Sequence, residues 1–206
     1  MSNDDGEPGK KIAPLARTWP ELIDKMFGQP VQDLVGVAGG DYLAAVRPLN
    51  RQRIGEKVKE KLRKRGVEKP EPLSPKLLVP ALDALSDESD ETLQEMWANL
   101  MANAMDPNKP DISLQRIIVD TLKQFEPIDA LVLKQLSDGR RSDEIAKSFD
   151  QRETLIELAT ERLHRLGCLG EPQTVIVGHE LRTQYRLTAL GTELLWACEP
   201  DSADND

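Results

Sequence analysis

Two amide side chains, Asn99 and Asn103, lie one helical turn apart in a stretch whose other residues are mostly apolar. This spacing puts both on one face of an α-helix, beside the small residues Ala98 and Ala102. Amides donate and accept hydrogen bonds, and small side chains let a second backbone approach closely. The face is therefore a candidate partner surface, with its amides either satisfied inside the chain or used between subunits.

Groups typical of catalytic or metal sites do not fall into a recognisable pattern. His164 and His179 have no nucleophile motif or metal-ligand spacing around them. Cys168 and Cys198 lie outside any CxxC spacing, which favours reduced thiols over a zinc site or a disulfide framework. The glycines of residues 36–40 lack the preceding strand that a dinucleotide site needs. We therefore expect no enzymatic activity, no catalytic or metal-binding residue, no cofactor and no small-molecule substrate.

The net charge of the chain is -9, yet residues 47–69 hold ten Lys or Arg and three Glu. The overall acidity argues against a protein that coats nucleic acid non-specifically. A basic helix is predicted over residues 50–65, and its narrow apolar stripe of Ile54, Val58 and Leu62 indicates shallow burial. Its cations form either a solvated face or an electrostatic contact with a membrane surface, with nucleic acid, or with the protein's own acidic regions in a partner subunit. The candidate contact residues are Arg51, Arg53, Lys57, Lys61 and Lys64.

The amide-bearing helix has an apolar stripe at three-and-four spacing, which predicts burial along one side. A second helix precedes it, with Ser74 as N-cap and Pro75 at the first helical position. Pro80 either kinks that helix or marks its start. Together these helices cover residues 74–105, and the stripe of the amide-bearing helix consists of Leu93, Met96, Trp97, Leu100, Met101 and Ala104.

These residues carry a resemblance to a known family. The block of residues 72–106, which contains LQEMWANLMANA, resembles the signature block of the abortive infection alpha family of bacterial proteins implicated in phage defence. Membership implies a process, defence against phage, and brings no catalytic residue with it. The likeness extends to residues 23–30 (IDKMFGQP), 125–133 (FEPIDALVL) and 187–198 (LTALGTELLWAC).

Further helices are expected on both sides of this block. Thr18 and Glu21 form a capping box that opens a short helix ended by Gly28. A helix from Pro30 is broken by Pro48, after which the basic helix begins. A last helix of this region covers residues 112–125, and Ile117 belongs to its apolar set. We therefore expect disorder over residues 1–17 and a helical domain over residues 18–126.

The rest of the chain has the element order of a winged helix domain, predicted over residues 127–198. Three helices come first, the third from Gln151 to Leu166. A hairpin follows, with one strand at residues 173–177 and the second at residues 183–188. A final helix runs from Ala189 to Ala197, and residues 199–206 form an acidic tail expected to be disordered.

If this domain read DNA, its third helix would enter the major groove. Glutamates at 153, 157 and 161 of the same helix would then face phosphates, which weakens the DNA hypothesis. Winged helices also serve as protein-docking modules. The candidate DNA contacts are Arg152, Arg162, Arg165, Arg182 and Arg186.

The sequence thus predicts a mainly α protein with a helical region followed by a winged helix domain. Its N-terminus lacks the apolar core of a secretory signal, and no run reaches the roughly 18 apolar residues of a spanning helix, so we expect a cytoplasmic location. The favoured function is non-enzymatic phage defence through contacts with a protein partner or within a homo-oligomer. The alternative is a DNA-binding transcriptional regulator.

Overall fold

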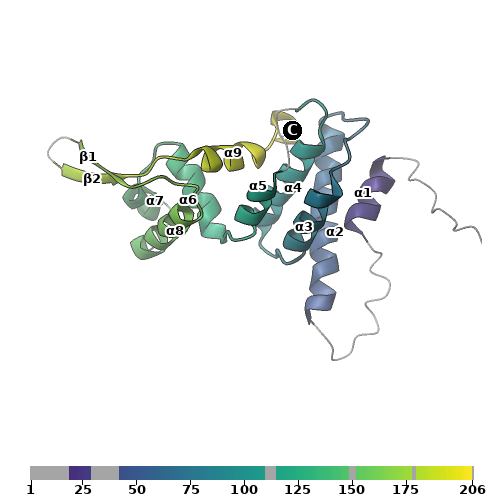
Figure 1. Ribbon diagram of the computed structural model, residues 1–206, viewed down its shortest axis with the longest axis horizontal. Coiled ribbons are helices and arrows are strands. Elements are labelled where there is room, and N and C mark those ends of the chain that lie inside the picture. Colours follow the sequence, from purple (N-terminus) through teal and green to yellow (C-terminus); the bar gives the residue numbers. More distant parts are fainter. Residues whose placement is uncertain (1–18, 29–41, 110–114, 149–151, 178–179, 206) are drawn as a thin grey trace, which may run out of the picture.

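The computed structural model describes residues 19–28, 42–109, 115–148, 152–177 and 180–205. These residues are mainly helical, with a single two-stranded sheet (Figure 1). The hairpin extends from one end of the molecule, and α1 lies at the other end. The elements in order are α1 Trp19–Phe27, α2 Tyr42–Lys64, α3 Pro75–Ser86, α4 Glu91–Met105, α5 Arg116–Leu122, α6 Pro127–Ser137, α7 Ser142–Ser148, α8 Glu153–Arg165, β1 Gln173–Val177, β2 Glu180–Gln184, α9 Ala189–Ala197 and η2 Ser202–Asn205.

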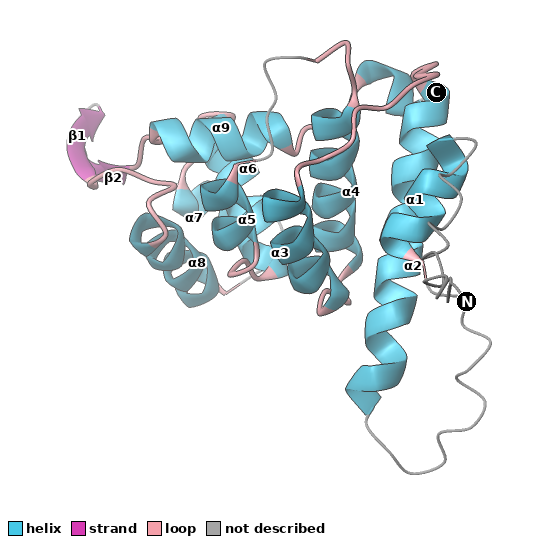
Figure 2. Cartoon of the chain, turned by 45° about the vertical axis from the view of Figure 1, so that its right-hand side comes forward, coloured by secondary structure: helices cyan, strands magenta, loops and turns pink. Residues whose placement is uncertain are grey.

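Helix α2 corrects two of the predictions. It is one continuous helix that contains Pro48, so the expected break at this proline is wrong. It also packs against α1, α3 and α4 (Figure 2). Its stripe of Ile54, Val58 and Leu62 is fully buried, in contrast to the shallow burial expected. A Cβ at Gly55 would lie 2.6 Å from the Cβ of Phe27 on α1. The glycine therefore lets α1 approach, and the burial of α2 offsets the missing N–H of the proline.

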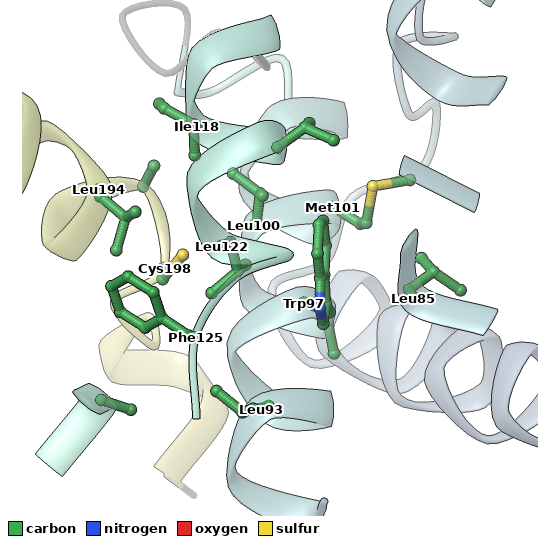
Figure 3. Packing of buried hydrophobic residues seen from close by; sticks show 14 of the residues in the cluster. Leu85, Leu93, Trp97, Leu100, Met101, Ile118, Leu122, Phe125, Leu194 and Cys198 are labelled. Carbon is green, nitrogen blue, oxygen red and sulfur yellow. The ribbon is translucent and has the colours of Figure 1, made fainter. Parts of the chain in front are cut away.

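Helices α3 and α4 form the centre of the core. Asp90 caps α4 by accepting hydrogen bonds from the N–H groups of Thr92 and Leu93. Trp97 is only 1% exposed and lies between α4 and Leu85 of α3 (Figure 3). Helix α3 starts at Pro75 and runs through Pro80, which decides between the two alternatives that the sequence left open.

Helix α5 packs against α3 and α9. Its residues Ile118 and Leu122 are buried, but Ile117 is 53% exposed, so the prediction that Ile117 faces the core is wrong. The helix starts at Arg116, and the earlier part of the predicted helix lies partly outside the described residues. The buried side of α5 consists of Ile118, Val119, Thr121 and Leu122, and Ile117 lies outside it.

The second half of the chain contains α6, α7 and α8, then the hairpin and α9. Gly139 and Gly167 end α6 and α8 with φ angles of 79° and 77°, which favour glycine. The first strand agrees with the prediction, whereas β2 begins at Glu180, three residues before its predicted start. The antiparallel register explains this shift, because it pairs Val177 with Glu180. The sequence prediction placed the start of the strand later because it relied on the β-branched residues.

Helix α9 returns the chain to the core. Thr188 caps this helix, and a Cβ at Gly191 would lie only 2.1 Å from the carbonyl oxygen of Cys168. This close approach holds α9 against the end of α8, and α9 then contacts α4, α5 and α6. In the close view Leu194 and Cys198 gather beside Phe125 (Figure 3). The helix therefore links the hairpin half of the chain to the signature helices.

Residues 199–205 differ from the expected disordered tail. They fold into a turn and the short helix η2, which packs against α2. Their carboxylates form ion pairs with Arg65, which follows α2, and with Lys109 in the turn after α4. These contacts order the segment, which its composition alone did not predict. Residues 1–17, which were also expected to be disordered, lie outside the described residues. Within the described ranges, no helix has both the length and the hydropathy needed to cross a bilayer.

Candidate functional site

The amide face of α4 is buried inside the chain. Asn99 is 3% exposed and donates from its Nδ2 to the carbonyl oxygen of Cys198 at 3.0 Å. Asn103 is fully buried and donates to the carbonyl oxygens of Ala197 (2.8 Å) and Glu199 (3.0 Å). Ala98 and Ala102 are buried as well. The candidate partner surface is thus used within the chain, because the amides bind the last carbonyl groups of α9, which have no partner inside that helix.

Asn103 also orients two cations through its other amide atom. Its Oδ1 accepts hydrogen bonds from Nη1 of Arg65 at 2.8 Å and from Nζ of Lys109 at 3.1 Å. One buried amide therefore joins α4 to α9, to the end of α2 and to the turn that follows α4. This arrangement fixes two positive groups on the side of the molecule where residues 199–205 lie.

Residues 199–205 bind these cations through two aspartates. Arg65 makes a bidentate pair with Asp204, with Nη2–Oδ2 and Nε–Oδ1 distances of 2.5 and 3.0 Å, and each of these side chains is only 3% exposed. Lys109 pairs with Asp201 at 2.7 Å. Lys61 lies 3.7 Å from Asp204. We call Lys61, Lys64, Arg65 and Lys109 the basic cradle.

The ionised state of both aspartates favours this contact. The hydrogen bond from Lys109 lowers the pKa of Asp201 to about 2. Burial alone would raise the pKa of Asp204, but the hydrogen bonds from Arg65 and from the Asp201 backbone outweigh it and lower that pKa. Both carboxylates are therefore charged at neutral pH and attract the basic cradle.

The candidate cations of α2 divide into paired and exposed groups. Lys57 contacts Glu91 and Glu95 at 2.9 Å each, and Lys61 contacts Glu95 at 2.5 Å. Burial lowers the pKa of Lys57, but its hydrogen bonds to both glutamates more than reverse this, and the net pKa is raised. Lys64 donates to the backbone oxygen of Asp204. Arg53 is exposed, whereas the Nε of Arg51 is buried and has no hydrogen-bond partner among the described residues.

Much of the basic helix therefore meets acidic residues of the same chain. The sequence left open a contact with acidic regions of a partner subunit, whereas the acidic groups that these cations contact lie on α4 and in residues 199–205 of the same chain.

The five candidate DNA-contacting arginines belong to different parts of the second half of the chain. Arg162 makes a bidentate pair with Asp129 of α6, at 2.6 and 2.8 Å, and the Asp129 side chain is fully buried. Its guanidinium thereby ties α8 to α6. Arg152 and Arg165 are exposed at opposite ends of α8. Arg182 lies on β2 with Val175 as its strand partner, and the exposed Arg186 follows that strand.

The two cysteines are free and buried. Burial raises the pKa of Cys168 to about 11 and that of Cys198 to about 12. The Nδ1 of His164 lies 3.1 Å from the carbonyl oxygen of Leu169, and His179 is outside the described residues. Among the described residues, no group of three or more His, Cys, Asp or Glu side chains could hold a metal ion.

Sequence reasoning missed Arg65, Lys109, Asp201 and Asp204 as a site. Arg65 was one cation among many in a charged run, and Lys109 stood alone after a turn. A possible signal was the Asp-x-x-Asp spacing of residues 201–204, which matches one turn of a short helix, in a chain with a distant basic run. That signal does not reveal which cations would be used.

The signature block and the elements around it decide the family. The abortive infection alpha family model matches residues 50–198, from within α2 to the end of α9. The chain belongs to the abortive infection alpha family. This membership confirms the resemblance found from the signature block, and residues 199–206 follow the matched region. Comparisons with curated proteins and with solved structures found no match.

Proposed function

We propose that this member of the abortive infection alpha family is a phage-defence protein that acts without catalysis, in the bacterial cytoplasm, through contacts with other proteins. The observation that carries the proposal is the family match over residues 50–198, which includes the signature helices α3 and α4. Those helices build the core and hold α9 through Asn99 and Asn103. The signature residues thus serve the scaffold, and the contacts that act on a partner are expected on exposed surfaces.

The exposed side of α8 supports protein contact over DNA contact. Glu153, Glu157 and Glu161 are exposed there, against the exposed arginines Arg152 and Arg165. Phosphates would meet more negative than positive charge on this side, which disfavours a DNA groove. Leu158, on the same side, is 55% exposed and offers apolar contact area to a protein.

We further propose that residues 127–198 form a winged helix used as a protein-docking module. The order of α6, α7, α8, β1, β2 and α9 supports this, because three helices followed by a hairpin are expected of that domain. In this proposal α8 holds the position of the recognition helix. Its pairing with α6 through Arg162 and Asp129 uses one of the cations that DNA reading would need.

A phage challenge tests the proposed process. Bacteria expressing the chain and bacteria with an empty vector are infected with a broad panel of phages, and plaque numbers are compared. Fewer plaques for one or more phages in the expressing strain are expected. Equal plaque numbers across the whole panel, with soluble protein present, would contradict the proposal.

Variants of two exposed apolar residues test the contact surface in the same assay. Leu158→Asp on α8 is expected to abolish plaque reduction, whereas Val79→Asp on α3 is expected to preserve it. Val79 is a matched control, since it is also aliphatic, helical and exposed, at 64% against 55% for Leu158. Both variants should keep the wild-type melting temperature. Loss of defence in Arg152→Ala/Arg165→Ala, with full defence in Leu158→Asp, would favour DNA contact instead.

A further inference from the structure

Three of the four cations of the basic cradle, Lys61, Arg65 and Lys109, also have contacts outside residues 199–205. Arg65 and Lys109 are held by the Oδ1 of Asn103, and Lys61 is held by Glu95. Asp106 lies 3.9 Å from Arg65, so it neutralises the guanidinium only partly. Removal of residues 199–205 would therefore leave preorganised positive groups in place, and such groups bind carboxylates at a low entropic cost.

Residues 199–205, which we call the acidic segment, bind the basic cradle in a defined conformation. Its two carboxylates are oriented by their own backbone: Asp201 Oδ1 accepts from the N–H of Ala203 at 3.0 Å, and Asp204 Oδ2 accepts from the N–H of Asp201 at 3.1 Å. The resulting turn directs Asp201 to Lys109 and Asp204 to Arg65. Lys64 adds a 3.0 Å hydrogen bond to the backbone oxygen of Asp204. The basic cradle thus binds an Asp-x-x-Asp turn through both aspartate side chains and one backbone carbonyl group of the turn.

We propose that the basic cradle is a docking site for an acidic segment of a partner protein, with two carboxylates three residues apart, and that residues 199–205 occupy it in the free protein. The partner segment binds by displacing the chain's own segment, which acts as an intramolecular competitor. This inference rests on the proposed function only in identifying the partner as a protein. The charge complementarity of the cradle, and the acidic segment already seated on it, define the chemistry of the occupant.

The tethering of residues 199–205 makes the competition strong. A short tether gives an effective concentration in the millimolar range, so the wild-type chain accepts an external segment only when that segment binds tightly or is abundant. Neutralising Asp201 and Asp204 removes the competitor and leaves every cation of the cradle unchanged. Binding of an external acidic peptide then reports on the cradle directly.

The experiment measures fluorescence anisotropy of a labelled peptide with the sequence EPDSADND, which is residues 199–206. The full-length Asp201→Asn/Asp204→Asn variant is expected to bind this peptide at least about tenfold more tightly than the wild-type chain does, because its own segment no longer competes. A peptide with both corresponding aspartates changed to asparagine is expected not to bind. Equal affinity of the two proteins, or no binding to the variant, would overturn the proposal.

Two further variants in the same background separate binding from folding. Lys109→Gln changes a cradle residue whose side chain is 23% exposed, so the fold is expected to remain intact while peptide affinity falls at least about threefold. Lys76→Gln changes an exposed lysine of α3 and is the matched control, with unchanged affinity expected. Equal affinities of these two variants would count against the cradle. Circular dichroism spectra and melting temperatures are measured to check that both variants are folded.

A second copy of the chain could supply the same acidic segment, and sedimentation distinguishes this source. The wild-type chain is expected to remain monomeric over the concentrations used for the peptide. A dimer that forms at those concentrations and is lost in Asp201→Asn/Asp204→Asn would show exchange between copies and overturn the assignment to a different partner. These readings are made on purified protein, so they are independent of plaque reduction.

Discussion

Replacing Asn103 by alanine tests the central role of this amide in joining the elements. The side chain is fully buried and makes hydrogen bonds to two carbonyl groups and to two cations. A hydrogen bond contributes about 1 kcal/mol net, and one to a charged group about 1.5 to 3 kcal/mol. Water can reach Lys109 and replace part of the loss. If water fully replaces the Lys109 bond, the two carbonyl bonds and the bond from Arg65 remain, so we expect Asn103→Ala to lower the free energy of unfolding by about 3.5 to 5 kcal/mol.

Asn99 supplies an internal control of the same residue type, on the same helix face and with similar burial. It makes a single hydrogen bond, to the carbonyl oxygen of Cys198, and its Oδ1 has no hydrogen-bond partner among the described residues. Alanine at this position removes one hydrogen bond and also removes an unsatisfied buried oxygen. The expected loss for Asn99→Ala is therefore only about 1 kcal/mol.

Urea denaturation followed by circular dichroism measures both variants against the wild-type chain. For a chain of this length each kcal/mol corresponds to a shift of about 2 to 4 °C in melting temperature, which gives a second readout. The expected order is wild type, then Asn99→Ala, then Asn103→Ala. Equal losses for the two variants, or a loss below about 1 kcal/mol for Asn103→Ala, would refute the reasoning because hydrogen bonding would then not distinguish the sites.

Three other predictions concern the core, the thiols and pH. Trp97→Ala should cost about 3 to 5 kcal/mol in urea denaturation, since the side chain is 1% exposed, and an unchanged midpoint would contradict its burial. Cys168 and Cys198, with pKa values raised to about 11 and about 12, should react with a thiol reagent at pH 8 only after unfolding; rapid labelling of the native chain would contradict this. The lowered pKa values of Asp201 and Asp204 stabilise the acidic segment above about pH 4, and this contribution is lost as the pH falls toward 2. Faster amide hydrogen exchange in residues 199–205 at low pH, after correction for intrinsic rates, would report this loss, and pH-independent protection would exclude it.

Local pattern predicted the helices well where their buried stripe is wide. The three-and-four spacing around Trp97 predicted α4 and its burial, because enough apolar residues lie on one side. The pattern around Ile54 underestimated the burial of α2, since part of that burial comes from Gly55, where the absence of a side chain admits Phe27. Apolar spacing does not reveal a contact made through a missing Cβ.

The hydrogen-bond and ion-pair partners of the candidate site residues could not be predicted from the sequence. The sequence identified Asn99 and Asn103 as hydrogen-bonding groups but left internal and intersubunit use open. Their partners are backbone carbonyl groups of residues 197–199, nearly a hundred residues away in the chain, and backbone groups carry no sequence signal. The pairing of Arg65 with Asp204 depends in the same way on tertiary placement. Composition indicated a charged tail, and only the fold indicates where it binds.

Abortive infection by this protein is tested by culture survival at a high phage-to-cell ratio, with a phage whose plaque number the protein reduces. We expect cultures expressing the chain to collapse early and release few new phages, and cultures expressing Leu158→Asp to lyse at the normal time with a full phage yield. Continued growth of the wild-type culture, or a phage yield equal to that of the empty vector, would contradict abortive infection through this protein.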